Sequence, residues 1–178
     1  LSASGTKSDL MFLPVALASV GLICSILGIF IVKMFSNKAA DVALRMGTIG
    51  AAVLFIMAAY VLMNKMGIST AVWLSVVAGA VGGIIIGLVT EYYTGGKPVR
   101  TLAKSGETGP ATVMISGLAI GMESVVIPVM TLAGIILFTS MVLPEGAGIY
   151  GVGIAAIGML ATVGITMAID AYGPVADN

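Results

Sequence analysis

Histidine is absent from the 178 residues, and the chain has a single cysteine, Cys24. Without histidine, the chain cannot build a Ser-His-Asp or Cys-His catalytic centre, or an imidazole metal site, from its own residues. One thiol cannot form a disulfide framework, and Cys24 lies in an apolar run where a small packed side chain is expected. The sequence therefore excludes nucleophilic catalysis with a histidine base within this chain.

Charged residues are also scarce, at 9% of the chain, and eight acids balance eight bases. A soluble domain is about one-quarter charged, so this chain could not cover itself with polar surface in water. The hydrophobic content of 59% and the mean hydropathy of +1.16 predict an integral membrane protein, because lipid solvates apolar side chains directly. A net charge of zero excludes bulk electrostatic attraction to nucleic acid.

Long apolar runs predict an all-α, polytopic transmembrane helix bundle. About 20 apolar residues cross the hydrocarbon as an α-helix. A β-barrel is disfavoured, because the runs are continuous and do not alternate with polar residues. The fourth run is longer than a bilayer requires, so we expect it to tilt or to project into solvent. The five predicted spans are 10–32, 46–63, 70–90, 109–142 and 149–169.

Glycines at a spacing of four residues predict where these helices pack. Gly79, Gly83 and Gly87 follow one another on the third span, and Gly117 and Gly121 lie on the fourth. Small residues at this spacing let two helix backbones approach closely in lipid. We therefore expect them to mark helix contacts and not a ligand site.

Basic residues divide unequally between the two sides of a chain with five spans. Because the spans alternate in direction, the stretches 33–45 and 91–108 share one side and hold six bases. The other side holds Lys7 and Lys65 only. The positive-inside rule therefore predicts that both stretches, and the C-terminus with them, are cytoplasmic.

Two glutamates occupy positions where a solvated loop is not the default. Glu123 lies about 20 Å along the fourth span, where a carboxylate costs several kcal/mol unless it is paired, protonated or wetted. It is either part of an ion path, or a carboxyl group that is hydrogen-bonded to a neighbouring helix or displaced toward water. Glu91 closes the third span, where a carboxylate opposes the helix dipole. A partner cation, a metal-linked network or exposure to water would each offset that cost.

The last nine residues carry two further acids. Asp170 and Asp177 are two helical turns apart, about 10 Å along the axis if the helix persists. Pro174 cannot donate to the carbonyl of Asp170, so a kink is expected that frees an oxygen. Such a row of oxygen ligands suits Mg²⁺. A helix end solvated by water explains these residues equally well.

Three stretches combine glycine-rich runs with acidic or polar motifs. They are GGIIIG at 82–87 with TEYYT at 90–94, TGPAT at 108–112 with GLAIG at 117–121, and GMLAT at 158–162 with IDAYGPVADN at 169–178. In order and spacing they resemble the membrane-integral pyrophosphatases, which hydrolyse inorganic pyrophosphate and pump H⁺ or Na⁺. The resemblance covers roughly residues 71–178, and residues 1–70 agree mainly in hydropathy.

The resemblance implies roles for particular residues. Asp177 matches an acid that helps to bind the Mg²⁺–pyrophosphate complex, and Asp170 and Asn178 belong to the same motif. Glu91 matches an acid with a supporting catalytic role, whereas Glu123 matches no motif of the family. Mg²⁺ is the implied cofactor, and the family admits K⁺ as an activator.

The resemblance also implies the setting of the chain. The family forms homodimers of sixteen-helix subunits in the lipid bilayer, and residues 1–178 would be a fragment of that single transmembrane domain. It would supply helices seven to eleven, with no separate soluble domain, and would be inactive alone because the other acidic motifs are missing. The expected location is the plasma membrane of a prokaryote, with a vacuolar or acidocalcisome membrane as the alternative. Two other classes stay open: a secondary transporter with Glu123 in a midplane site, and a non-catalytic scaffold.

Overall fold

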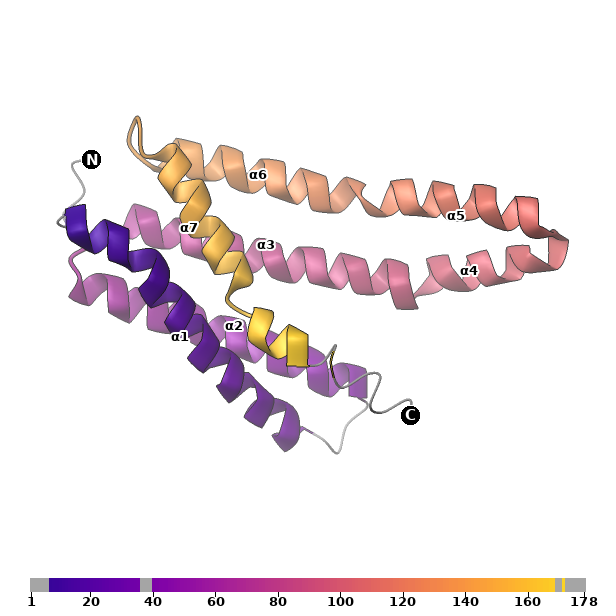
Figure 1. The fold of residues 1–178 in the computed structure, drawn as a ribbon, viewed down its shortest axis with the longest axis horizontal. Coiled ribbons are helices and arrows are strands. Elements are labelled where there is room, and N and C mark those ends of the chain that lie inside the picture. Colours follow the sequence, from indigo (N-terminus) through magenta and orange to yellow (C-terminus); the bar gives the residue numbers. More distant parts are fainter. Residues whose placement is uncertain (1–6, 36–39, 169–170, 172–178) are drawn as a thin grey trace.

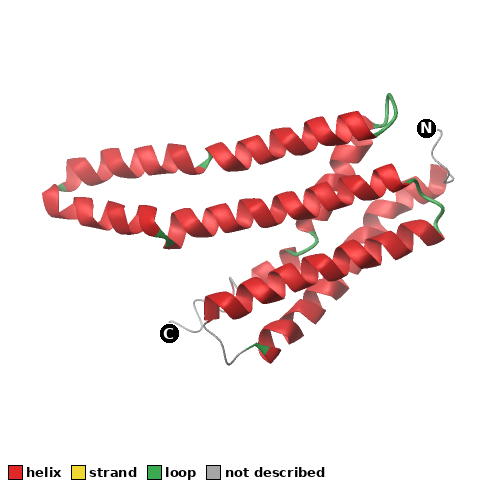
Figure 2. Cartoon of the chain, turned by 180° about the vertical axis from the view of Figure 1, so that it is seen from behind, coloured by secondary structure: helices red, strands yellow, loops and turns green. Residues whose placement is uncertain are grey.

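The computed structural model describes residues 7–35, 40–168 and 171, which form helices and short turns with no strand among them (Figures 1 and 2). Five helical runs within these residues are long and apolar enough to cross a membrane, which confirms the all-α prediction. The helices are α1 Lys7–Met34, α2 Ala40–Lys65, α3 Thr70–Gly95, α4 Lys97–Ser105, α5 Pro110–Ser124, α6 Val126–Val142 and α7 Gly148–Leu160, with a 3₁₀ turn at Gly106–Thr108 between α4 and α5.

The helices pack as two antiparallel pairs that α7 joins (Figure 1). α1 runs beside α2, and the line of α3 and α4 runs beside the line of α5 and α6. α7 crosses α3 and also contacts α1 and α6. The fully buried side chains of α1, α2, α3 and α7 meet in one apolar core; they include Leu13, Leu17, Phe55, Val76 and Ile154.

The polar stretch 91–108, predicted as a loop, is mostly helical. α3 continues to Gly95, and α4 and the 3₁₀ turn occupy most of the remainder. Pro98 lies in the first turn of α4, where backbone N–H groups have no partner within the helix, so the lack of an N–H costs no hydrogen bond. Gly96 separates the two helices, and its N–H donates to the Tyr92 carbonyl at 2.9 Å. The prediction missed the helical structure here because it relied on long apolar runs. A polar helix contains no such run.

The predicted fourth span is two helices with a break at Val125. Pro128 lies in the first turn of α6, so it has no N–H to donate to the carbonyl of Ser124, and its ring crowds that carbonyl. α5 forms a helical hairpin with α4 that extends away from the other helices (Figure 1). Met114, Ile115 and Leu118 on α5 are at least 69% exposed in this chain.

The predicted fifth span also contains a turn. α7 ends at Leu160, residues 161–162 form a turn, and helical residues resume at 163–168. The buried hydroxyl of Ser25 on α1 donates to the carbonyl of Ala161 at this turn, over 3.0 Å. Ile165, which is 1% exposed, then packs against α1 and α2 near Gly28 and Gly47. The segment after the turn is therefore fixed against the first helix pair.

The closest helix contact lies between α3 and α7. A Cβ atom at Gly79 would overlap the backbone of Ala155, and one at Gly158 would overlap the backbone of Val76. Gly83 approaches Met159, so two of the three glycines predicted on this face are confirmed as contact positions. A Cβ atom at Gly87 would meet no described atom of another helix within 4 Å.

Gly79→Ala should destabilise the bundle, because the added methyl group forces α3 and α7 apart. We expect a loss of about 1–3 kcal/mol, or more, in the free energy of unfolding, measured by denaturation of the chain in detergent micelles. Gly87→Ala is the matched control on the same helix, and it should be neutral or slightly stabilising. Equal stability of the two variants would contradict the α3–α7 contact.

Candidate functional site

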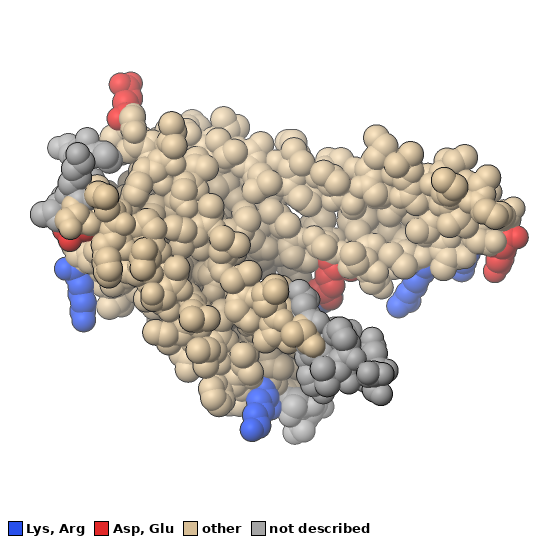
Figure 3. All heavy atoms as spheres, viewed as in Figure 1, with Lys and Arg blue, Asp and Glu red and all other residues tan. Residues whose placement is uncertain are grey.

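Most charged side chains gather at one end of the bundle. Five bases lie at the end opposite the α2–α3 and α6–α7 turns (Figure 1). They are Lys33 at the end of α1, Arg45 near the start of α2, and Lys97, Arg100 and Lys104 on α4. We call this the basic end. The face visible in Figure 3 is almost entirely uncharged, with acidic and basic side chains near its edges. Among the described side chains, the opposite end carries the base Lys65.

Three charged residues with interhelix contacts lie at the same depth near the basic end. Arg45, Glu91 and Glu123 are each about 20 residues from the opposite ends of α2, α3 and α6 respectively, which corresponds to about 30 Å. That distance is roughly the thickness of the hydrocarbon. Glu123 therefore lies about one hydrocarbon thickness from the far end of α6.

Arg45 and Glu91 form an ion pair between α2 and α3. Nη2 of Arg45 lies 2.6 Å from Oε1 of Glu91, and Nε lies 3.1 Å from each carboxylate oxygen. The side chains are 54% and 42% exposed, so water screens the pair. Glu91 precedes the end of α3 by four residues, and Arg45 supplies a cation that offsets the helix dipole there. Of the accounts offered for Glu91, a partner cation and exposure to water are both observed.

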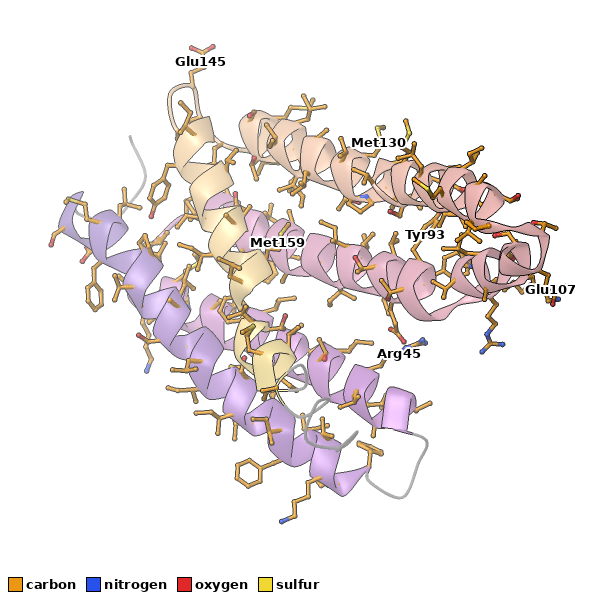
Figure 4. The ribbon with its side chains drawn as sticks, turned by 45° about the vertical axis from the view of Figure 1, so that its right-hand side comes forward. Arg45, Tyr93, Glu107, Met130, Glu145 and Met159 are labelled. Carbon is orange, nitrogen blue, oxygen red and sulfur yellow. The ribbon has the colours of Figure 1, made fainter. Side chains whose placement is uncertain are left out.

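A cleft of about 610 Å³ adjoins this ion pair. Its walls come from α2, α3 and the segment after α7, and Figure 4 shows Arg45 in the space between α2 and α3. Besides Arg45 and Glu91, its polar lining consists of five threonines: Thr48, Thr90, Thr94, Thr162 and Thr166. Four of these hydroxyls donate to the carbonyl four residues earlier in the chain. Their oxygens keep lone pairs that can accept hydrogen bonds from water or bind a cation.

Glu123 bonds to the neighbouring helix. The hydroxyl of Tyr93 on α3 donates to Oε1 of Glu123 over 3.0 Å, and Figure 4 shows Tyr93 between α3 and α5. The ring of Tyr93 also meets that of Tyr92 edge to face, with centroids 5.3 Å apart. This bond agrees with the interpretation of Glu123 as a carboxyl group hydrogen-bonded to a neighbouring helix, and the exposed position of Glu123 agrees with a carboxyl group that reaches water. A role in an ion path stays a prediction.

The acids and amide of the last motif lie outside the described residues. Asp170, Asp177 and Asn178 are among them, so the structure gives no geometry for the predicted metal ligands. Within the part of the chain that is described, no three acidic, histidine or cysteine side chains gather as a metal site. The structure does bring Thr162 and Thr166, which precede that motif, into one cleft with Arg45 and Glu91.

Sequence reasoning missed two participants. In the sequence, Arg45 is one of six bases on the predicted cytoplasmic side, and only the structure shows that it lies five residues inside α2 and faces another helix. Tyr93 was read as part of a motif and not as the partner of Glu123. No spacing within a single span could have paired them, because the partners are 46 and 30 residues apart along the chain.

Comparison with known proteins identifies the family of this chain. A sequence model of the family described as inorganic H⁺ pyrophosphatase matches residues 2–178. The chain belongs to this family. The match includes residues 2–70, which resembled the family mainly in hydropathy, and it confirms the resemblance carried by the three motif stretches.

Relatives within the inorganic H⁺ pyrophosphatase family include pumps for two ions. The chain is 44% identical to a putative K⁺-stimulated pyrophosphate-energized sodium pump of Bacteroides thetaiotaomicron, covering 93% of this chain and 24% of that protein. It is 37% identical to a K⁺-insensitive pyrophosphate-energized proton pump of Methanosarcina mazei, covering 98% and 27%. It is also 37% identical to a K⁺-stimulated pyrophosphate-energized sodium pump of Thermotoga maritima, covering 97% and 26%. The chain thus spans about a quarter of the length of these relatives.

Tyr93→Phe should weaken the contact between α3 and α5, because it removes the donor to Glu123 and retains the ring. We expect a small loss of stability, because the hydrogen bond is exposed to water, measured as a lower denaturation midpoint in detergent micelles. Tyr92→Phe is the matched control, since Tyr92 contacts its neighbour through the ring. In a Glu123→Gln background the effect of Tyr93→Phe should shrink, and an unchanged effect would contradict the pairing.

Proposed function

We propose that the full-length protein hydrolyses inorganic pyrophosphate with Mg²⁺ and uses that reaction to pump H⁺ or Na⁺ across a membrane. The observation that carries the proposal is the family match over residues 2–178, together with relatives whose names all describe pyrophosphate-energized pumps. Because the chain covers about a quarter of those relatives, it supplies part of the machinery, and by itself it is inactive under this proposal.

Asp177, Asp170 and Asn178 are the proposed ligands of the Mg²⁺–pyrophosphate complex. Carboxylate and amide oxygens are the hard donors that Mg²⁺ takes, so the donor set suits this ion in chemistry. Two carboxylates and one amide do not complete its six ligands, so waters, pyrophosphate oxygens and residues from the rest of the protein complete them. When bound, Mg²⁺ neutralises the phosphate oxygens and lowers the barrier to attack by water.

Glu91 belongs to this proposal as a supporting residue. It is held by Arg45 in the described structure and lies beside the threonines that precede the metal motif in the sequence. K⁺ activation, a homodimeric assembly and a prokaryotic plasma membrane complete the proposal. The K⁺-stimulated relatives support the first of these.

A secondary transporter is the competing function. It required a carboxylate at the membrane midplane, and Glu123 was the candidate. In this structure Glu123 lies about 30 Å from the opposite end of α6 and accepts a hydrogen bond from Tyr93. This location gives no support to a midplane site, so the pyrophosphate-driven pump is the function that we retain.

Asp177→Ala in the full-length protein should abolish Mg²⁺-dependent hydrolysis of pyrophosphate, since a ligand of the metal complex is lost. Phosphate release from purified protein in lipid vesicles measures this, and we expect a loss of at least about 100-fold. Glu145→Ala is the matched control, because Glu145 is an exposed acid on the α6–α7 connection at the far end, pointing away from the bundle (Figure 4). Activity retained in Asp177→Ala would contradict the assignment of this residue.

The basic end should face the cytoplasm, because five bases lie there against two, Lys7 and Lys65, at the opposite end. The variants Lys104→Cys and Glu145→Cys, each in a background with the other cysteines replaced, can be labelled with a membrane-impermeant thiol reagent to test this orientation. In intact cells the reagent should label the cysteine at position 145, and the one at position 104 should react only after the membrane is opened. The reverse pattern would overturn the proposed orientation.

A further inference from the structure

α2 and α3 are held together at one end and separate toward the other. Near the turn that joins them, the ring N–H of Trp73 donates to the carbonyl of Ile56 at 3.2 Å, and Tyr60 meets the Trp73 ring edge to face. Toward the basic end, the cleft of about 610 Å³ opens between the two helices, and Figure 1 shows their ribbons diverging there. The spacing of α2 and α3 at the basic end is therefore not set by direct packing of side chains against each other.

The ion pair of Arg45 and Glu91 spans the cleft at this open end. Arginine presents its N–H groups in a rigid plane, so a two-oxygen contact fixes direction as well as distance. In a half-exposed position such a pair contributes little to overall stability. It does tie two otherwise separate helix ends at a defined distance.

The segment after α7 lies in the same cleft. Thr162 and Thr166 line it together with Arg45 and Glu91. On its other side the segment is fixed by Ser25 at Ala161 and by the buried side chain of Ile165 against α1 and α2. A change in the separation of α2 and α3 would therefore move the wall on which this segment rests. The same segment leads, within four residues of Thr166, to Asp170 in the sequence.

We propose that Arg45 and Glu91 are positioning residues for the metal–pyrophosphate site. Their ion pair sets the separation of α2 and α3 at the basic end, and through the cleft it sets the position of residues 161–168, which precede the acidic motif in the sequence. The inference rests on the proposed function, in which that motif binds Mg²⁺ and pyrophosphate. Arg45 acts here through its partner and not by touching the substrate.

The charge swap in the full-length protein tests this proposal. Arg45→Glu and Glu91→Arg should each raise the Mg²⁺ concentration for half-maximal hydrolysis by roughly 10-fold or more, because small misplacements of ligands are costly. The double variant Arg45→Glu/Glu91→Arg should return that concentration to within about 3-fold of the parent, because it restores an ion pair. The matched control is Arg100→Glu/Glu107→Arg on α4 and the adjoining 3₁₀ turn, which reverses two charges outside the cleft and should leave the concentration unchanged.

Two results would overturn the proposal. One is an unchanged Mg²⁺ requirement in both single variants, which would mean that the pair does not position the site. The other is a folded double variant, with the thermal stability of the parent, that regains no Mg²⁺ affinity. Glu91 would then act through its own charge and not through its link to Arg45.

A distance measurement keeps the test independent of hydrolysis. Spin labels at Met46 on α2 and Tyr92 on α3, both exposed, report the separation of the helices at the basic end. The distance distribution should broaden or shift in Arg45→Glu and recover in the double variant. If the parent protein hydrolyses no pyrophosphate, the proposed function fails; an unchanged distance in Arg45→Glu overturns the positioning role separately.

Discussion

The backbone contact between α3 and α7 determines how the rest of the chain can be arranged. In lipid there is little hydrophobic gain in bringing two apolar helices together, so association depends on close packing. Gly79 and Gly158 supply it, because each lets the partner backbone lie where a side chain would otherwise be. With α7 held on α3, its turn at Ala161 falls beside α1, and the following segment is directed between the first helix pair and α3.

The polar features of the molecule follow from this arrangement and from depth in the membrane. Arg45, Glu91 and Glu123 lie about 30 Å from the opposite ends of their helices, and the side chains of Arg45 and Glu91 are about half exposed. A charged side chain that reaches water avoids the cost of charge in hydrocarbon. Glu91 and Glu123 each have a specific partner on another helix, Arg45 and Tyr93 respectively. Together with the threonines of the cleft, they make the basic end the polar part of an otherwise apolar bundle.

The broken helices have local causes that are visible in the sequence once they are sought. Pro128 interrupts the fourth run by withholding an N–H and crowding the carbonyl of Ser124. Gly96 and Pro98 separate α3 from α4 in the same region where the charge density rises. A prediction based on hydropathy merges α5 with α6 and overlooks α4, because it registers solvation by lipid and not the pattern of backbone hydrogen bonds.

The sequence by itself determined that this is a membrane protein with five helical runs long and apolar enough to cross a bilayer. It also determined the unequal charge of the two ends and the family. These follow from composition and from motifs that are local in the chain, and lipid tolerates no other arrangement of such apolar runs. Only the tertiary structure decided that Glu91 pairs with Arg45, that Glu123 accepts from Tyr93, and that Thr162 and Thr166 share a cleft with the ion pair. These contacts join residues that are 30 or more positions apart, and their existence depends on how far each helix extends and where it breaks. That information becomes available only when the helices are packed.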